Sequence, residues 1–360
     1  MSIWQFAEYL PKLPAEAQLT LGEGNTPLTR SRRIGPSAGL KNLYFKLETS
    51  NPSGSYKDRF AAAAVSEMLA NQSKVCLATS SGNTGAALSA YCAAAGIACY
   101  VVVVDGAPQN KLRQMMAYGT QILSVRRFGL DPSATEGVMN ELYRLVEKRN
   151  AALAISAYRY SPGGMTGVET LSYELAAQLP ERLDHVFCPA GGGGMALAVA
   201  RGFANLRQRQ RMTRPVAVEC VQPEGNNTIA GPLRDGLPRA KATMSTTAVS
   251  GLQVASVIDG DEVIAACREC GGTGHLVSDA QVYEAQARLA REEGIFSEPA
   301  GAVALAGVLA ARAAGYLQAD SEVVCFVTSF GFKDEASVLK MIAGAQCPLL
   351  DSADQIESVL

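Results

Sequence analysis

The sequence has almost no net charge and no long apolar run, and each of these shortages argues against a class of protein. It also has only two histidines, which makes a histidine-rich metal site unexpected. Because its 32 basic and 34 acidic residues nearly cancel, nothing in the composition indicates a nucleic-acid partner or an anionic membrane surface. The longest uninterrupted apolar run covers residues 97–104, far short of the about 20 residues that a membrane span needs. The first residues lack the basic and then apolar segments of a secretory signal, so we expect a cytoplasmic protein with no membrane attachment.

The composition is that of a globular protein with buried thiols. A length of 360 residues suits about two domains, and 48% hydrophobic with 18% charged residues is typical of folded chains. Most of the nine cysteines lie in apolar stretches, which suits free thiols in a reducing compartment: Cys76, Cys92, Cys99, Cys188, Cys220 and Cys325. Cys267 and Cys270 form a CxxC pair near His275. One such pair is a weak zinc signal, and we expect no metal site.

Strand-like runs alternate with alanine-rich helical runs through most of the sequence. We expect strands over residues 75–79, 97–104, 121–125, 151–157, 185–190, 216–221 and 322–328, and helices over 60–70, 86–95, 111–118, 133–148, 169–178 and 195–206. This alternation predicts an α/β fold whose mostly parallel sheets are covered by helices on both faces. Long Gly/Ser-rich linkers are absent, so we expect two interlocked three-layer lobes that share one cleft, with ligands at the carboxyl ends of strands.

One lysine, Lys57, stands between a turn-forming run and a helical run. Small and turn-forming residues occupy positions 51–55, and the alanine-rich run 60–70 follows. A single lysine in a loop is most often a surface residue. At the positive end of a helix, however, the charged form of an amine is disfavoured, which favours the neutral nucleophile that forms an imine with an aldehyde. Lys57 is therefore a candidate nucleophile.

Four consecutive glycines, Gly191 to Gly194, follow a predicted strand and open a predicted helix. Successive N–H groups without side chains can approach a phosphate, and a helix N-terminus adds a favourable field. The pattern also fits the dinucleotide motif GxGxxA through Ala196, with Glu219 near the place of a ribose-binding carboxylate. A nicotinamide-dependent oxidoreductase is therefore an alternative at this point.

Two further loops follow predicted strands. The loop over residues 80–85 contains small hydroxyl and amide groups at a helix start, which suit a carboxylate ligand, although a simple N-cap has the same composition. Asn83 in this loop is able to reach a ring oxygen, and the hydroxyl of Thr328 is able to contact a pyridine nitrogen. Together with Lys57 and the glycines, these loops supply what a pyridoxal phosphate site demands.

Six segments resemble the fold type II family of pyridoxal phosphate enzymes, and among them most closely the threonine synthases: residues 21–28, 43–48, 51–59, 80–85, 297–302 and 328–334. The resemblance implies pyridoxal 5'-phosphate as cofactor and a homodimer. It also implies a large cofactor-binding lobe over residues 1–55 plus 161–360 and a smaller substrate-side lobe over residues 56–160.

The resemblance further implies a role for each candidate residue. Lys57 would form the imine with the cofactor and later transfer protons, Asn83 would face the ring hydroxyl, and Thr328 would contact the ring nitrogen. The cofactor phosphate would be held by Gly191, Gly192, Gly193 and Gly194, and the substrate carboxylate by Ser80, Ser81 and Thr84.

The sequence departs from threonine synthases at their second anion site. Gly164 and Glu169 stand where those enzymes carry an arginine and a lysine, so Arg159, or Lys111 with Arg113, would have to bind the substrate phosphate. We expect elimination or replacement on an amino acid such as O-phospho-L-homoserine, giving L-threonine and phosphate. The alternatives are a serine/threonine dehydratase or ammonia-lyase, which the tetraglycine loop and residues 298–302 favour, and a β-replacement synthase that uses a serine derivative.

Overall fold

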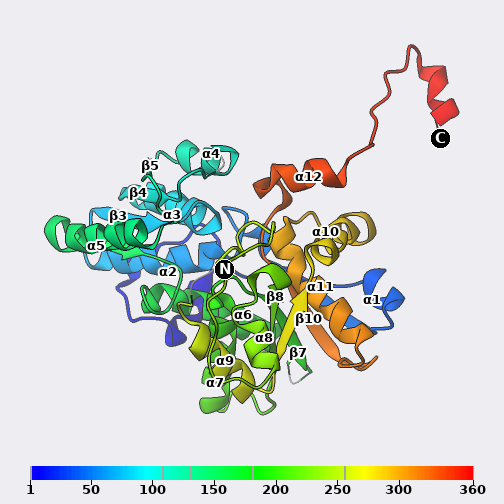
Figure 1. Ribbon diagram of the computed structural model, residues 1–360. Coiled ribbons are helices and arrows are strands. Elements are labelled where there is room, and N and C mark those ends of the chain that lie inside the picture. The colour runs from blue at the N-terminus through cyan, green and yellow to red at the C-terminus, as the bar shows by residue number, and fades with distance from the viewer. Residues whose placement is uncertain (1, 108, 130, 181, 255–256, 360) are drawn as a thin grey trace.

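The computed structural model describes residues 2–107, 109–129, 131–180, 182–254 and 257–359, and its strands form two sheets (Figure 1). The larger sheet has the order β1 (Leu28–Arg30), β2 (Asn42–Leu47), β10 (Glu322–Val327), β7 (His185–Pro189), β8 (Ala217–Pro223) and β9 (Gly274–Val277). In this sheet β1 runs antiparallel to β2 and the other neighbours are parallel. The smaller, parallel sheet has the order β5 (Gln121–Ser124), β4 (Ala98–Val103), β3 (Val75–Thr79) and β6 (Ala151–Ala154).

Helices cover both faces of each sheet, because successive strand residues face opposite ways and both faces are apolar. On the larger sheet, α10 (Asp279–Glu293) and α11 (Pro299–Ala313) cover one face, while α6 (Pro162–Gln178), α7 (Gly194–Gln208) and α9 (Gly260–Glu269) cover the other. On the smaller sheet, α5 (Pro132–Arg149) lies opposite α2 (Lys57–Ala70), α3 (Asn83–Ala95) and α4 (Gln109–Ala117). The predicted α/β fold with two three-layer lobes is confirmed.

The remaining helices are short. They are α1 (Ile34–Ser37), α8 (Ala230–Arg234), α12 (Glu335–Met341) and the 3₁₀ helices η1 (Ile3–Tyr9), η2 (Ala15–Ala17), η3 (Glu48–Ser50), η4 (Glu224–Asn226), η5 (Gly331–Lys333) and η6 (Ala353–Val359). Figure 1 shows the chain beyond α12 leading away from both lobes. None of the helices in the described ranges combines the length and the apolarity needed to cross a membrane.

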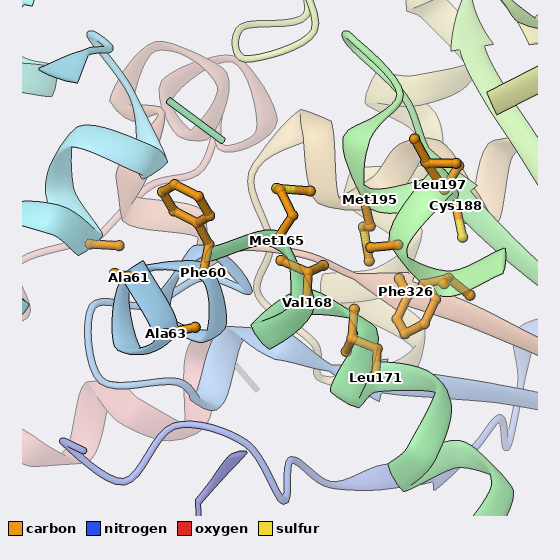
Figure 2. Close-up of a cluster of buried hydrophobic side chains, with 14 of the residues drawn as sticks. Phe60, Ala61, Ala63, Met165, Val168, Leu171, Cys188, Met195, Leu197 and Phe326 are labelled. Carbon is orange, nitrogen blue, oxygen red and sulfur yellow. The ribbon is translucent and has the colours of Figure 1, made fainter. Parts of the chain in front are cut away.

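Helices α2 and α6 pack against each other at unusually short range, and this contact positions the start of α2. A Cβ atom on Gly167 would lie 2.1 Å from the carbonyl oxygen of Arg59, and one on Gly164 would lie 2.8 Å from a ring carbon of Phe60. Only glycine permits this approach at the two positions. Figure 2 shows Phe60 in the same buried hydrophobic cluster as Met165 and Val168 of α6.

A buried ionic cluster fixes the first turn of α2. Arg59, which is fully buried, donates from Nε and Nη2 to the two oxygens of Glu48 at 2.7 and 2.8 Å, and from Nη1 and Nη2 to those of Glu174 at 2.7 and 2.9 Å. Lys46 Nζ donates to Glu174 Oε2 at 2.7 Å. Although burial raises it, Arg59 and Lys46 hold the pKa of Glu174 at about 2. Two cations thus balance two carboxylates in this cluster. Lys57 lies two residues before Arg59, about half a helical turn away.

The start of one predicted helix was wrong. The helix expected over residues 169–178 is α6, which already begins at Pro162. Proline is favoured at the first helical position, and the glycines that read as a loop are required by the contact with α2. Strands β1, β2 and β9 and helices α9, α10 and α11 were not predicted. The division into residues 1–55 plus 161–360 and residues 56–160 stays a prediction; the smaller sheet lies within residues 75–154.

Candidate active site

The carboxyl ends of five strands line one cavity of about 870 Å³. Thr79 ends β3, Val104 follows β4, Ile155 follows β6, Pro189 ends β7 and Thr328 follows β10, so both sheets contribute to its wall. The cavity also contains the candidate residues Lys57, Ser80, Ser81, Asn83, Thr84, Gly191, Gly192, Gly193 and Gly194. Segments far apart in the sequence therefore meet at the edge of the sheets where ligands bind in α/β proteins.

Lys57 is the first residue of α2, and its side chain points to the end of β6. The backbone N–H of Tyr56 donates to the carbonyl of Thr328 at 3.0 Å, which attaches the helix start to the end of β10. The Lys57 Nζ atom donates to Ser156 Oγ at 2.8 Å, and that oxygen lies 3.0 Å from Thr84 Oγ1. Ser156 therefore joins the candidate amine to the loop that is proposed to seat the substrate.

Ser156 was not predicted from the sequence. The strand expected over residues 151–157 was too long, because β6 already ends at Ala154. Ser156 lay inside that expected strand, and its place two residues beyond the true strand end is visible only in the structure.

The tetraglycine loop lies beside the same serine. A Cβ atom on Gly194, the first residue of α7, would lie 3.3 Å from the carbonyl oxygen of Ser156. Gly193 has φ = 84°, and a Cβ there would lie 2.6 Å from Val263 Cγ2, so glycine is needed for both conformation and space. The loop thus offers backbone N–H groups at the start of a helix of 15 residues, which is the chemistry that a phosphate requires.

A carboxylate in the cavity wall, Glu298, accepts hydrogen bonds from two candidate segments. Asn83 Nδ2 donates to Glu298 Oε1 at 2.7 Å, and the Ser329 hydroxyl donates to the same oxygen. Thr328 is 4% exposed, and its Oγ1 lies 3.5 Å from Ser329 Oγ. Glu298, Asn83 and Thr328 all border the cavity, so this group connects the loop after β3 with the end of β10.

Neither of the two arginines expected to bind a substrate phosphate, Arg159 and Arg113, borders this cavity. Arg159 is exposed outside its wall; its backbone N–H donates to Asp259 Oδ1 at 3.2 Å and its guanidinium carbon lies 5.9 Å from the centre of the Tyr160 ring. Lys111 belongs to α4, and its side chain lies outside the described part of the structure. Arg113 lines an adjoining cavity of about 830 Å³ together with Lys333.

The two positions that depart from threonine synthases, Gly164 and Glu169, lie in buried contacts within the protein. Gly164 lies under the buried ring of Phe60, which leaves no room for a longer side chain. Glu169 is 8% exposed and accepts hydrogen bonds from the hydroxyls of Tyr158 at 2.7 Å and Tyr173 at 3.1 Å. Burial raises the pKa of Glu169. Neither position presents a cation to the cavity.

Glu219, the carboxylate of the dinucleotide alternative, is engaged elsewhere. It is fully buried near the start of β8 and accepts hydrogen bonds from His185 Nδ1 at 2.8 Å and His275 Nε2 at 3.1 Å. Although burial raises it, these bonds hold the pKa of Glu219 at about 2. Because the tetraglycine loop lies at the other end of the sheet, Glu219 does not meet a ligand bound there. Cys270, of the weak zinc motif, donates its thiol to the carbonyl of Cys267 at 3.1 Å.

The family model for pyridoxal-phosphate dependent enzymes matches residues 19–329. The chain therefore belongs to this family, and its cofactor is pyridoxal 5'-phosphate. Among its relatives, the threonine synthase of Methanocaldococcus jannaschii is 29% identical over 346 residues (94% of this chain and 82% of the relative), and that of Synechocystis sp. is 30% identical over 357 residues (98% and 86%).

Solved structures agree on the fold. The processed form of threonine deaminase isoform 2 from Solanum lycopersicum superimposes with a TM-score of 0.74 at 21% identity, covering 96% of this chain and 94% of that chain. Maize serine racemase gives a TM-score of 0.74 at 23% identity, covering 95% and 97%. The chain thus has the fold type II architecture of this enzyme family. The lysine, the glycine cradle and the strand-end hydroxyls all fit pyridoxal 5'-phosphate in this one cavity.

Proposed function

We propose that this enzyme catalyses elimination or replacement on a small amino acid, in the manner of a threonine synthase, with O-phospho-L-homoserine converted to L-threonine and phosphate as the first candidate reaction. The observation that carries the proposal is the contact of Lys57 Nζ with Ser156 Oγ, between the glycine cradle and the loop that contains Thr84. The threonine synthases that align with nearly the whole chain support it.

The proposed roles follow from position. Lys57 would hold the cofactor aldehyde, the glycines of the loop its phosphate, and Thr328 and Asn83 its ring; the cofactor supplies an electron sink for carbanion chemistry when it is bound. Lys57 Nζ would then take the α-proton of the substrate and return a proton at a later step, a transfer typically worth about 10²–10⁴-fold in rate. Ser156 Oγ would orient the amine at 2.8 Å between these transfers.

The substrate carboxylate is assigned to the loop after β3. Ser80, Ser81 and Thr84 border the cavity at the start of α3, where N–H donors and the helix field favour an anion. A distal phosphate would lie toward the adjoining cavity, which shares Gly82 and Asn83 with the first and contains Arg113. Arg113 would therefore bind the substrate phosphate, because position 164 has no room for an arginine.

The activity test uses four substrates. The holoenzyme is incubated with O-phospho-L-homoserine, O-phospho-L-serine, L-threonine and L-serine, and phosphate and keto acid are measured. We expect phosphate and threonine from O-phospho-L-homoserine. Arg113→Gln should raise KM for this substrate while leaving cofactor absorbance unchanged, since a charge-assisted hydrogen bond contributes about 1.5–3 kcal/mol. Phosphate release from neither phosphorylated substrate would exclude the proposal.

The packing at position 164 favours one second candidate, a serine/threonine dehydratase. Such an enzyme needs no distal phosphate site, and the ring of Phe60 leaves no room for a cationic side chain at position 164. Keto acid from L-threonine or L-serine, with no effect of Arg113→Gln on its rate, would favour this activity. A homodimer and a cytoplasmic location remain part of the proposal and are tested by light scattering and by fractionation of the source cell.

A further inference from the structure

Three cysteines from separate elements of the smaller lobe meet at one point. Cys76 lies in β3, Cys99 in β4 and Cys92 in α3, and the register of the sheet pairs Cys76 directly with Cys99. Their three Sγ atoms all lie within 4.8 Å of one another. Cys76 and Cys92 are fully buried, and Cys99 is 8% exposed. Sequence spacing gave no sign of this grouping, because the strand register and the return of α3 over the sheet create it.

The cluster lies away from the catalytic cavity. Cys76 and Cys99 are each the second residue of their strand, whereas the loop over residues 80–84 follows the last residue of β3. Thr79 lies three residues beyond Cys76 along β3, which is about 10 Å. A ligand among the thiols would therefore not compete with cofactor or substrate.

The arrangement fits a three-coordinate thiolate site. With metal–sulfur bonds of about 2.3 Å, the sulfurs of a trigonal site lie about 4 Å apart, within the separation of these Sγ atoms. In the part of the chain that the structure describes, no histidine, carboxylate or fourth cysteine joins the group. Structural Zn²⁺ takes four ligands, whereas Cu(I) is soft and is selected by thiolates. Three sulfurs alone therefore favour Cu(I).

A buried hydroxyl adjoins the cluster. Thr120 is 7% exposed and lies beside Cys99, so its hydroxyl is placed to donate to a thiolate formed there.

We propose that Cys76, Cys92 and Cys99 form a Cu(I) site. Each thiol that becomes a ligand releases its proton to solvent, so affinity rises with pH. The bound ion would join β3, β4 and α3, the elements that carry the proposed carboxylate loop, and would stabilise the folded smaller lobe because the unfolded chain lacks the preformed site.

The test is an anaerobic titration of the holoenzyme with Cu(I), buffered by a chelator of known affinity. It is done in a Cys347→Ser background, because Cys347 is an exposed thiol that would bind the ion on its own. We expect one Cu(I) per chain, tighter binding at higher pH and a raised melting temperature. Cys92→Ala should lower the affinity by more than the roughly 10- to 100-fold that loss of an outer-shell group costs.

The matched control is Cys325→Ala, which removes a fully buried cysteine from β10 of the other sheet and should leave binding unchanged. Equal affinity in Cys92→Ala and the control overturns the site, and so does binding of Zn²⁺ more tightly than Cu(I). A loss of two free thiols on exposure to air, which Cys92→Ala prevents, identifies a disulfide instead and also overturns it. Circular dichroism checks folding, and Cys76→Ala serves as the second variant.

Discussion

Replacement of Arg59 tests whether the buried ionic cluster holds the helix that carries Lys57. Arg59→Met keeps an apolar stem of similar length but removes the guanidinium, so Glu48 and Glu174 remain buried opposite Lys46 alone. Removing one partner of a buried ion pair costs about 3–5 kcal/mol, because it leaves an uncompensated charge. Arg59→Lys keeps the charge but loses the planar fork that reaches both carboxylates, and should cost about 2 kcal/mol.

The assay is urea denaturation followed by circular dichroism, with the wild type and both variants compared at several pH values. In the wild type the pKa of Glu174 is lowered to about 2, so its stabilising contribution is present above the ordinary value of 4.5 and is lost only as pH falls through about 2. In Arg59→Met the Glu174 carboxylate has lost its guanidinium partner and accepts a proton more readily. The deficit should therefore be largest near about pH 7 and should shrink toward about pH 4. A Met variant as stable as the wild type at neutral pH would refute this reasoning.

Three further predictions concern the cavity and its surroundings. Gly193→Ala should weaken cofactor binding and lower the melting temperature, since its φ of 84° costs alanine about 1–2 kcal/mol, whereas Gly192→Ala, with its nearest neighbour at 3.6 Å, should leave the fold intact; equal melting temperatures contradict this. Burial raises the pKa of Asp58 to about 7, so its stabilising effect, complete below the unfolded value of 3.8, is lost as pH rises through about 7. Asp58→Asn should reduce this loss, by up to about 4 kcal/mol between about pH 4 and pH 8, and urea midpoints that stay parallel to the wild type would refute it. Ser156→Ala should retain cofactor absorbance but lower kcat roughly 10- to 100-fold by freeing the Lys57 amine, and an unchanged kcat would count against the role of this serine.

Much of the fold was predictable because its signals are local. Runs such as residues 75–79 and 322–328 are apolar on both faces, which is typical of the buried parallel strands β3 and β10 that they form. The start of α6 was not predictable in the same way. Its proline and glycines act as local helix breakers, and only the close approach of α2 explains their presence inside a helix.

The site residues also differ in whether local sequence identifies them. Lys57 and the tetraglycine loop were identified from their immediate neighbours in the sequence, and the structure brings both to one cavity. Ser156 and the thiol cluster depend on contacts between residues distant in sequence, with 99 positions separating Lys57 from Ser156. Arg159 shows the opposite case: its charge suggested a ligand for phosphate, but the turn after β6 directs its side chain to the surface.

The most direct measurement asks which amine holds pyridoxal 5'-phosphate. Borohydride reduction of the purified holoenzyme attaches the cofactor permanently to the side chain that carries it, and mass spectrometry of the peptides identifies that residue. We expect the label on the peptide that contains Lys57. Lys333 and Lys340 also border the two cavities, and a label on either of them instead would contradict the account.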